Sequence, residues 1–123
     1  RFDLYPPACW KYFHPLRFVH RKQIQYLFDT LREVGVQGGE LPIILAGNFN
    51  AAPQSPIFVK FNKDFQDCFK LKGAGYGATQ PVDFPLLRLD RVFCTHPLRP
   101  ERACTVLVPD TFRRSILADI SMP

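Results

Sequence analysis

Hydrophobic residues follow helical spacing most clearly between Phe18 and Val34. Apolar positions there recur every three or four residues, and charged and amide side chains occupy the other faces; the apolar positions are Ile24, Leu27, Phe28 and Leu31. This spacing predicts an amphipathic helix over residues 18–34. Gly35 follows directly and is predicted to end the helix as its C-terminal cap.

Residues 1–17 show no comparable period. The segment, RFDLYPPACWKYFHPLR, is rich in aromatic residues and proline, and we predict an irregular or partly extended conformation. We therefore divide the chain into this N-terminal segment, residues 1–17, and a domain over residues 18–123. The aromatic side chains are expected to pack in the core or to anchor the chain to a neighbour, because tryptophan and tyrosine concentrate at interfaces.

Short apolar runs separated by glycine and proline predict the remaining elements. Residues 41–46 are wholly apolar and are predicted to form a buried strand. Further strands are expected over residues 86–94, 103–108 and 115–120, short helices near residues 56–59 and 67–71, and a glycine-rich loop over residues 72–81. One long helix, one strand and three later strands indicate an α/β fold with a mixed sheet.

Composition places the chain among globular domains. It has 123 residues, of which 46% are hydrophobic and 22% charged, so one core can form and disorder is not expected. No apolar run approaches the roughly 18 residues that a membrane span needs, and no membrane attachment is expected. The net charge of +5 suits an anionic partner such as nucleic acid, but equally a subunit of a complex or a chain kept in solution by its charge.

The four cysteines show no Cys-x-x-Cys spacing. Cys9, Cys68 and Cys94 each adjoin an aromatic residue, whereas Cys104 does not, and we expect buried free thiols rather than a zinc site or a disulfide framework. This favours an intracellular, reducing compartment. The first residue is Arg1, which fits a processed chain or a piece of a longer one, and an imported mitochondrial protein after cleavage is compatible with that start.

Several short motifs occur in a fixed order. They are Arg21-x-x-x-Gln25 (or Arg21-x-Gln23), PIILAGNFNAAPQSP, Asp67-Cys68-Phe69, GYGATQP, RLDRVF at 88–93, and the final LADISMP. From Phe18 to the C-terminus this order resembles the C-terminal half of the endonuclease/exonuclease/phosphatase superfamily. Members of that superfamily often read GDFN, D-A-F, G-x-T, R-I-D-Y-I-F and S-D-H.

The resemblance implies a four-layer α/β sandwich, of which this chain would supply one half. It also implies metal-assisted hydrolysis of phosphate esters in nucleic acids, phosphoinositides or sphingolipids. Mg²⁺ prefers carboxylate oxygens. In the family, the GDFN Asp and Asn position the nucleophile and the phosphate, and the S-D-H His, oriented by the R-I-D Asp, binds the phosphate or shares in proton transfer.

Carried over to this chain, the resemblance places Asn48 where the family has Asp, and Asn50, Thr79 and Asp90 on matching positions. The S-D-H triplet falls on Thr111-Phe112-Arg113, which has no histidine. A shift of two residues would put Asp110 on the Asp. The three histidines lie elsewhere in the sequence: His14, which could be the remnant of a family Thr-His pair, His20 and His96.

These departures predict a lost catalytic site. An amide at position 48 cannot act as a general base near neutral pH, and the family's metal-binding Glu belongs to the N-terminal half, which has no counterpart here. We expect vestigial positions at Asn48, Asn50, Asp90 and Arg113, no metal ligands, and a need for Mg²⁺ only if activity remains. Asn50 is also a candidate Asx-turn residue. Phosphate-contacting positions are expected to be Asn50, Thr79, Arg113 and Arg114.

Asp90 has two interpretations. It could form a surface ion pair with Arg88 or Arg91, which contributes little. Alternatively, if Arg113 replaces the family His, Asp90 and Arg113 form a buried or semi-buried salt bridge that preserves the fold without the chemistry. A separate group of cations could contact nucleic acid or a partner protein: Arg99, Arg102, Arg113 and Arg114.

The sequence therefore predicts a catalytically degenerate half-domain that serves as a structural or scaffolding subunit. Its open sheet face would be covered by a protein partner or by a separate N-terminal half. Two alternatives remain open. The chain could be half of a magnesium-dependent phosphodiesterase or nuclease that the missing half completes, or a non-catalytic nucleic-acid-binding module.

Overall fold

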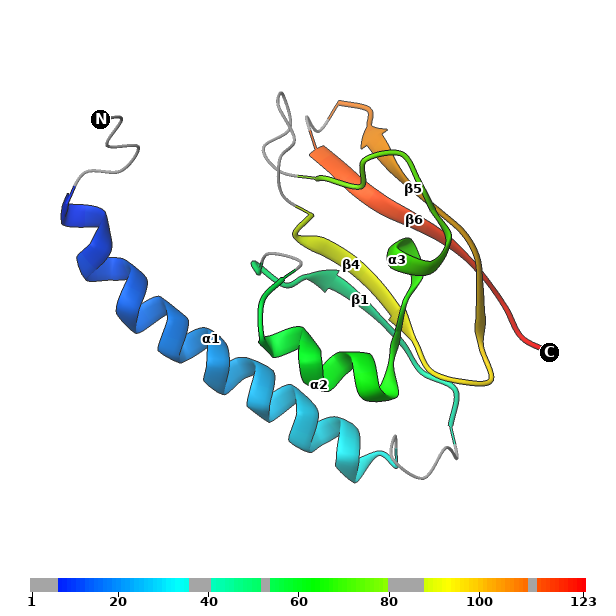
Figure 1. Ribbon diagram of the computed structural model, residues 1–123, viewed down its shortest axis with the longest axis horizontal. Helices are drawn as coiled ribbons and strands as arrows, with labels where there is room; N and C mark the ends of the chain where they lie inside the picture. The colour runs from blue at the N-terminus through cyan, green and yellow to red at the C-terminus, as the bar shows by residue number, and fades with distance from the viewer. Residues whose placement is uncertain (1–6, 36–40, 52–53, 80–87, 111–112) are drawn as a thin grey trace. The chain divides into compact units, whose positions relative to one another are not determined.

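A computed structural model describes residues 7–35, 41–51, 54–79, 88–110 and 113–123 (Figure 1). Side chains are described from Val19 onward, apart from that of Arg113. The chain divides into two compact units, Arg1–Val34 and Gly35–Pro123. No helix among these residues is both long and apolar enough to cross a membrane.

The first unit contains one long helix, α1 (Pro7–Glu33). The helix expected over residues 18–34 is confirmed, and Gly35 follows it with a left-handed φ of 86°, as expected for a C-terminal glycine. The irregular conformation expected for residues 1–17 is wrong from Pro7 onward. Pro7 occupies the first helical position, where a missing N–H costs nothing, and the helix continues through Pro15 despite the lost backbone hydrogen bond. The division expected between residues 17 and 18 falls inside this helix.

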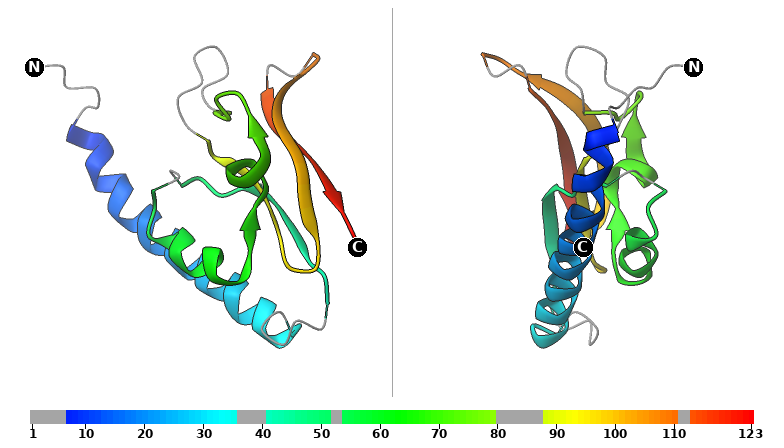
Figure 2. Two further views of the ribbon diagram at one scale, coloured as in Figure 1. Left: turned by 45° about the vertical axis from the view of Figure 1, so that its right-hand side comes forward. Right: turned by 90° about the vertical axis from the view of Figure 1, so that its left-hand side faces the viewer.

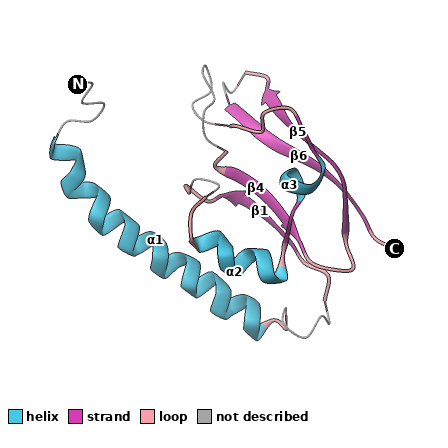
Figure 3. Ribbon diagram, viewed as in Figure 1, coloured by secondary structure: helices cyan, strands magenta, loops and turns pink. Residues whose placement is uncertain are grey.

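The second unit has two three-stranded sheets (Figure 3). In the first sheet, β4 (Asp90–Cys94) lies between β1 (Ile44–Asn48) and β2 (Gln66–Asp67), and both pairings are antiparallel. In the second, β5 (Arg99–Val108) pairs in parallel with β3 (Gly73–Ala74) and antiparallel with β6 (Arg113–Ser121). Helices α2 (Ile57–Asp64) and α3 (Cys68–Lys72) complete the unit. The mixed α/β prediction is confirmed.

Most expected elements of this unit are present with shifted bounds. Residues 56–59 open α2, with Pro56 preceding it, and residues 67–71 overlap α3. The strand expected over 86–94 begins at Asp90, and residues 86–87 lie outside the described part of the chain. The glycine-rich loop contributes the two-residue strand β3, while the turn expected at Gly38-Gly39 also lies outside the described residues.

An aromatic cluster joins α2 to one face of the β1–β4–β2 sheet. Its members are Phe49, Phe58, Phe61, Phe65 and Phe93. Phe93 is fully buried, and its ring stacks on that of Phe61 with centroids 5.2 Å apart. The apolar residues of α2 recur at helical spacing and turn Phe58 and Phe61 toward the sheet. This cluster fixes β4 and the end of β1, where the predicted site lies.

The opposite face of the same sheet packs against β5 and β6. Figure 2 shows α2 on one side of β1 and β4, and β5 and β6 on the other. Cys68, Cys94, Leu98 and Ala103 form the buried cluster between the sheets. Cys68 and Cys94 are free thiols with sulfurs 3.9 Å apart, as expected. Burial raises the pKa of Cys68 to about 12, so this thiol is unreactive near neutral pH.

The strand expected at residues 41–46 is present from Ile44 onward, but the burial expected for it is wrong. Strand β1 begins at Ile44, which is 55% exposed, and Leu41 is exposed as well. β1 lies at the edge of its sheet and pairs only with β4 among the described strands. A wholly apolar run is buried only when other elements cover both its faces, and no described strand lies along the outer edge of β1.

Candidate functional site

The Gly-Asn-Phe-Asn motif forms the end of β1 and the turn that follows. Asn48 is the last residue of the strand and pairs in register with Asp90. Directly opposed residues project from the same face of a sheet, so both side chains lie on the face toward β5 and β6. Phe49 projects from the other face into the aromatic cluster. The order of the motif thus places its amide and its phenyl ring on opposite faces.

The turn is held by Asn48 rather than by Asn50. The Asn48 Oδ1 accepts a hydrogen bond of 2.9 Å from the Asn50 backbone N–H, which makes Asn48 the Asx-turn residue. Asn50 adopts a left-handed φ of 47°, a conformation that asparagine tolerates better than most residues. The expectation that Asn50 is the Asx-turn residue is therefore corrected. Both side chains are exposed.

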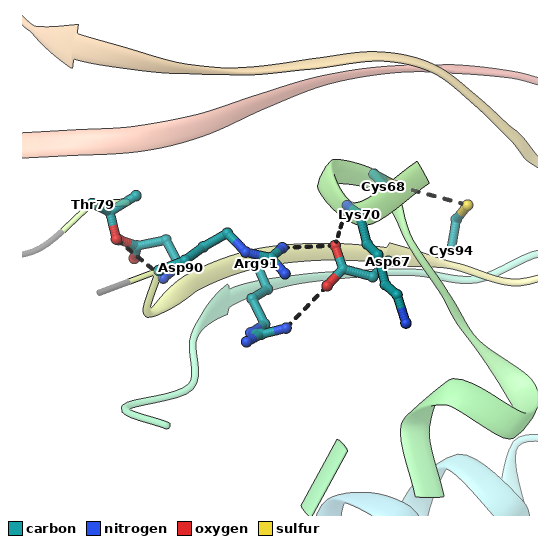
Figure 4. A network of polar contacts seen from close by, with 8 residues as sticks. Asp67, Cys68, Lys70, Thr79, Asp90, Arg91 and Cys94 are labelled. Atoms are coloured by element: carbon teal, nitrogen blue, oxygen red, sulfur yellow. Dashed lines mark hydrogen bonds and ion pairs between the residues drawn. The ribbon is translucent and has the colours of Figure 1, made fainter. Parts of the chain in front are cut away.

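Thr79 braces the backbone that enters β4. Its hydroxyl oxygen accepts hydrogen bonds of 3.3 Å from the backbone N–H groups of Leu89 and Asp90, and Figure 4 shows the second of these contacts. Thr79 is fully buried. In the described residues this hydroxyl braces the start of β4, and the phosphate contact expected for Thr79 stays a prediction.

The S-D-H position is only partly described. Arg113 opens β6 opposite Val108, but its side chain, together with Thr111 and Phe112, lies outside the described residues. The Asp90–Arg113 salt bridge therefore stays a prediction. Asp110 is exposed in the preceding turn, with a left-handed φ of 63°.

The histidines offer no described replacement. His96 follows the end of β4 that is farthest from Asp90. His14 and His20 belong to α1 in the other unit, and the His14 side chain is not described. The structure therefore brings Asn48, Asn50 and Asp90 together at one end of the sheet, without placing a histidine of the second unit beside them among the residues described.

The four arginines considered for phosphate binding do not gather in one place. Arg99 and Arg102 lie near one end of β5, whereas Arg113 and Arg114 pair with its other end. β5 is ten residues long, so its two ends lie about 30 Å apart at the usual rise per strand residue. Arg102 is also engaged, because two of its nitrogens donate to the Asp119 carboxylate at 2.8 and 2.6 Å.

A buried ionic cluster, missed from the sequence, lies on the α2 side of β4. Arg88 donates to Asp67 Oδ1 at 2.8 Å, and Arg91 donates to Asp67 Oδ2 at 2.9 Å. The Lys70 backbone N–H donates to Asp67 Oδ1 at 3.1 Å, so Asp67 also caps the N-terminus of α3. Figure 4 shows the Asp67 carboxylate held on both oxygens. One carboxylate thus serves two guanidinium groups and a helix.

The two arginines share this single carboxylate. Burial alone would raise the pKa of Asp67, but the hydrogen bond and charge of Arg88, the Lys70 N–H and the charge of Arg91 leave it below the ordinary value of 3.8. Burial and the nearby charge of Arg88 lower the pKa of Arg91 to about 10, although Asp67 acts in the opposite direction. The cluster is therefore ionised at neutral pH and retains excess positive charge.

The predicted ion pairs of Asp90 with Arg88 and Arg91 are replaced by this cluster. Successive residues of a strand project from opposite faces, so Arg91 points away from Asp90 and toward α2. A sequence signal existed for the cap alone: aspartate is a preferred N-cap residue, and Asp67 begins the short helix expected over residues 67–71. The partners of Asp67 are 21 and 24 residues distant along the chain, which a local pattern does not reveal.

The described residues do not form a magnesium site. No three histidine, cysteine, aspartate or glutamate side chains in the described part of the chain are grouped closely enough to hold a metal ion. At the end of β1 the candidate oxygen donors are the Asp90 carboxylate and the amides of Asn48 and Asn50, and the Asn48 oxygen already accepts a hydrogen bond. Magnesium prefers several carboxylate and water oxygens in octahedral geometry, so these residues alone do not fit it.

Comparison with known proteins relates nearly the whole chain to one family. The model of the Endonuclease/Exonuclease/phosphatase family matches residues 2–119. No curated protein sequence matches the chain.

Three solved structures share its fold at 18% identity. The endonuclease/exonuclease/phosphatase from Bacteroides vulgatus aligns with a TM-score of 0.67 over 85% of this chain and 44% of its own. A functionally unknown conserved protein from Enterococcus faecalis V583 gives 0.66 over 83% and 45%. The mannosyl-6-phosphatase of Bacteroides thetaiotaomicron VPI-5482 gives 0.59 over 80% and 44%. The chain thus spans less than half the length of these structures and has about half of their fold.

Proposed function

Since the chain belongs to the Endonuclease/Exonuclease/phosphatase family, we propose that it is a catalytically degenerate member with a structural or scaffolding role in a larger complex. The observation that supports this proposal most directly is the hydrogen bonding of the Asn48 side chain. Its side chain is an amide, and its oxygen holds the turn to Asn50. A residue used in this way offers neither a proton acceptor near neutral pH nor a negative charge for a cation.

The sheets supply the second argument, because apolar side chains on their facing surfaces remain uncovered. Ile44 on β1 is 55% exposed on the face that carries Asn48. Leu107 on β5 is 57% exposed, and it lies two positions beyond Thr105 and four beyond the buried Ala103, on the same face of the strand. We propose that a partner chain or a separate N-terminal half covers these surfaces and pairs with the outer edge of β1, since an unpaired apolar edge strand invites another strand.

Hydrolysis is the direct test of degeneracy. The chain and an Asn48→Asp variant are each assayed with bis(p-nitrophenyl) phosphate in Mg²⁺, with an EDTA control. We expect neither to hydrolyse the ester above the rate in buffer, because restoring one carboxylate beside Asp90 still leaves too few oxygen ligands for the metal. A Gln23→Glu variant, which adds the same charge at an exposed position of α1, serves as the matched control.

Two outcomes would contradict the proposal. EDTA-sensitive hydrolysis by the unmodified chain would mean that the Gly-Asn-Phe-Asn turn still supports metal-dependent catalysis. Activity gained by Asn48→Asp but not by Gln23→Glu would mean that the remaining site is intact and lacks one carboxylate only. Either result would favour a second candidate function, half of a magnesium-dependent phosphodiesterase, which is supported by the register that still opposes Asn48 and Asp90.

A further inference from the structure

A pocket between α2, α3 and β4 adjoins the buried ionic cluster. Its cavity volume is about 250 Å³, and its polar lining consists of Gln54, Asn62, Asp67, Lys70, Arg88 and Arg91. Arg91 enters it from the face of β4 that packs on α2, whereas Asp90 and Asn48 project from the other face. The pocket is therefore separate from the vestigial family site.

The lining of this pocket carries unbalanced positive charge. Lys70, Arg88 and Arg91 supply three cations, and Asp67 supplies the one carboxylate among the lining residues. Both arginines donate to that carboxylate, and their side chains are largely buried. Because buried charges are screened by solvent much less than exposed ones, their charge acts strongly inside the pocket. Two positive charges remain without a counterion in the lining.

Arg91 also has donors without acceptors. Its Nη1 donates to Asp67, and its guanidinium carbon lies 3.8 Å from the centre of the Phe58 ring. The Nε and Nη2 atoms are buried and have no hydrogen-bond partner in the part of the chain that is described. These two nitrogens form one edge of the guanidinium plane, which matches two oxygens of an oxyanion. Leaving such donors buried and unpaired is unfavourable.

We propose that this pocket binds a phosphate-sized dianion on the Nε–Nη2 edge of Arg91, with Lys70 and Arg88 balancing its charge. A phosphate group carries about −1.5 to −2 charges at neutral pH and so matches the excess of the lining, whereas a carboxylate carries one. Bidentate contact with arginine gives both strength and orientation. The site does not depend on the proposed loss of catalysis, because it uses the opposite face of the sheet.

Calorimetric titration with inorganic phosphate tests the site. The full chain at pH 7.5 is titrated with sodium phosphate, and sodium acetate and sodium chloride at equal ionic strength serve as comparisons. We expect saturable binding of one phosphate per chain and no saturable binding of acetate or chloride. Acetate binding as tightly as phosphate would contradict the proposed preference for a dianion. The absence of saturable phosphate binding would overturn the site itself.

Two neighbouring lysines on α3 provide the matched variants. Lys70 lines the pocket and Lys72 does not, and both are exposed, so neither is expected to be needed for folding. We expect Lys70→Gln to weaken phosphate binding roughly tenfold, the scale of one charge-assisted hydrogen bond, and Lys72→Gln to leave it within about twofold. Equal losses in both variants would indicate an adventitious ion only.

Arg91→Lys examines the proposed edge itself. Lysine keeps the positive charge opposite Asp67 but lacks the paired N–H donors. With its fold verified by circular dichroism, this variant is expected to lose saturable phosphate binding. Unchanged affinity in Arg91→Lys would overturn the assignment to the guanidinium edge. If Arg91→Lys does not fold, the comparison of Lys70→Gln with Lys72→Gln decides the question.

Discussion

Replacing Asp67 by asparagine is expected to lower the free energy of unfolding by about 3–5 kcal/mol, the range for removing one partner of a buried ion pair. Asp67 is the carboxylate that binds both Arg88 and Arg91, and it caps α3 through the Lys70 N–H. An amide has one acceptor oxygen and no charge, so the variant leaves two largely buried guanidinium groups uncompensated. Urea unfolding followed by circular dichroism measures the loss.

Two control variants separate the buried charge from simple loss of contact. Arg91→Met leaves Asp67 paired with Arg88 and is expected to cost about 1 kcal/mol, the net contribution of one hydrogen bond. Asp64→Asn removes an exposed carboxylate at the end of α2 and is expected to change stability by no more than about 0.5 kcal/mol. An Asp67→Asn loss no larger than that of Arg91→Met would contradict the central role of this carboxylate.

The same carboxylate gives the stability a defined pH dependence. The pKa of Asp67 in the folded chain lies below its ordinary value of 3.8, so the unfolded chain binds the proton more readily. The stabilisation is therefore complete above the unfolded-state pKa and is lost as the pH falls through the folded-state pKa. Asp67→Asn, if it folds, should lack this part of the acid destabilisation, and Asp64→Asn should retain it.

Replacing Phe93 by alanine is expected to lower the free energy of unfolding by about 3–5 kcal/mol. Phe93 is fully buried at the centre of the aromatic cluster. The centroid of its ring lies 5.2 Å from that of Phe61 and 5.5 Å from that of Phe49. Truncation removes these contacts and leaves a cavity between α2 and the sheet. Because small domains are stable by only about 5–15 kcal/mol, the urea midpoint should fall sharply.

Tyr76→Ala is the matched aromatic truncation. Tyr76 is 73% exposed in the loop after β3, so its removal is expected to change stability by no more than about 0.5 kcal/mol. If Phe93→Ala cost as little as Tyr76→Ala, the aromatic cluster would not be the core that positions β4 and the end of β1.

Periodicity predicted the C-terminal part of α1 but not its start. Between residues 18 and 34 the apolar spacing is regular and Gly35 supplies a recognisable end, so local information was sufficient. Pro7 and Pro15 suggested an irregular segment, yet α1 begins at the first of them and continues through the second. Proline destabilises a helix interior but is favoured at the first helical position. Only the structure shows which of these positions each proline occupies.

The exposure of β1 could not be predicted from the local sequence pattern. An apolar run such as residues 41–46 predicts a strand correctly, but its burial depends on what lies over its faces and edge. In the described chain β1 has one neighbouring strand, and Ile44 is more exposed than its hydrophobicity suggests. The discrepancy agrees with a chain that spans less than half of the related structures.

The candidate site was predictable in part. The motif order placed Asn48 and Asp90 near each other, and the register of β1 and β4 brings them opposite. The separation of Arg99 from Arg113 was not predicted, because it depends on how β5 pairs with β6. The burial of Thr79 was not predicted either, because it depends on the contact of Thr79 with Leu89 and Asp90. The Asp67 cluster was missed because it joins Asp67 of β2 to Arg88 and to Arg91 of β4, which lie far from it in the sequence and share no local motif with it.

Size-exclusion chromatography with light scattering on this chain alone tests the central claim, that the chain is a structural half-domain whose open surfaces need a complement. With Ile44 and Leu107 exposed and no described strand paired with the outer edge of β1, we expect self-associated or aggregated species at micromolar concentration. A stable, monodisperse monomer over the same range would mean that these surfaces need no cover, and would contradict the account.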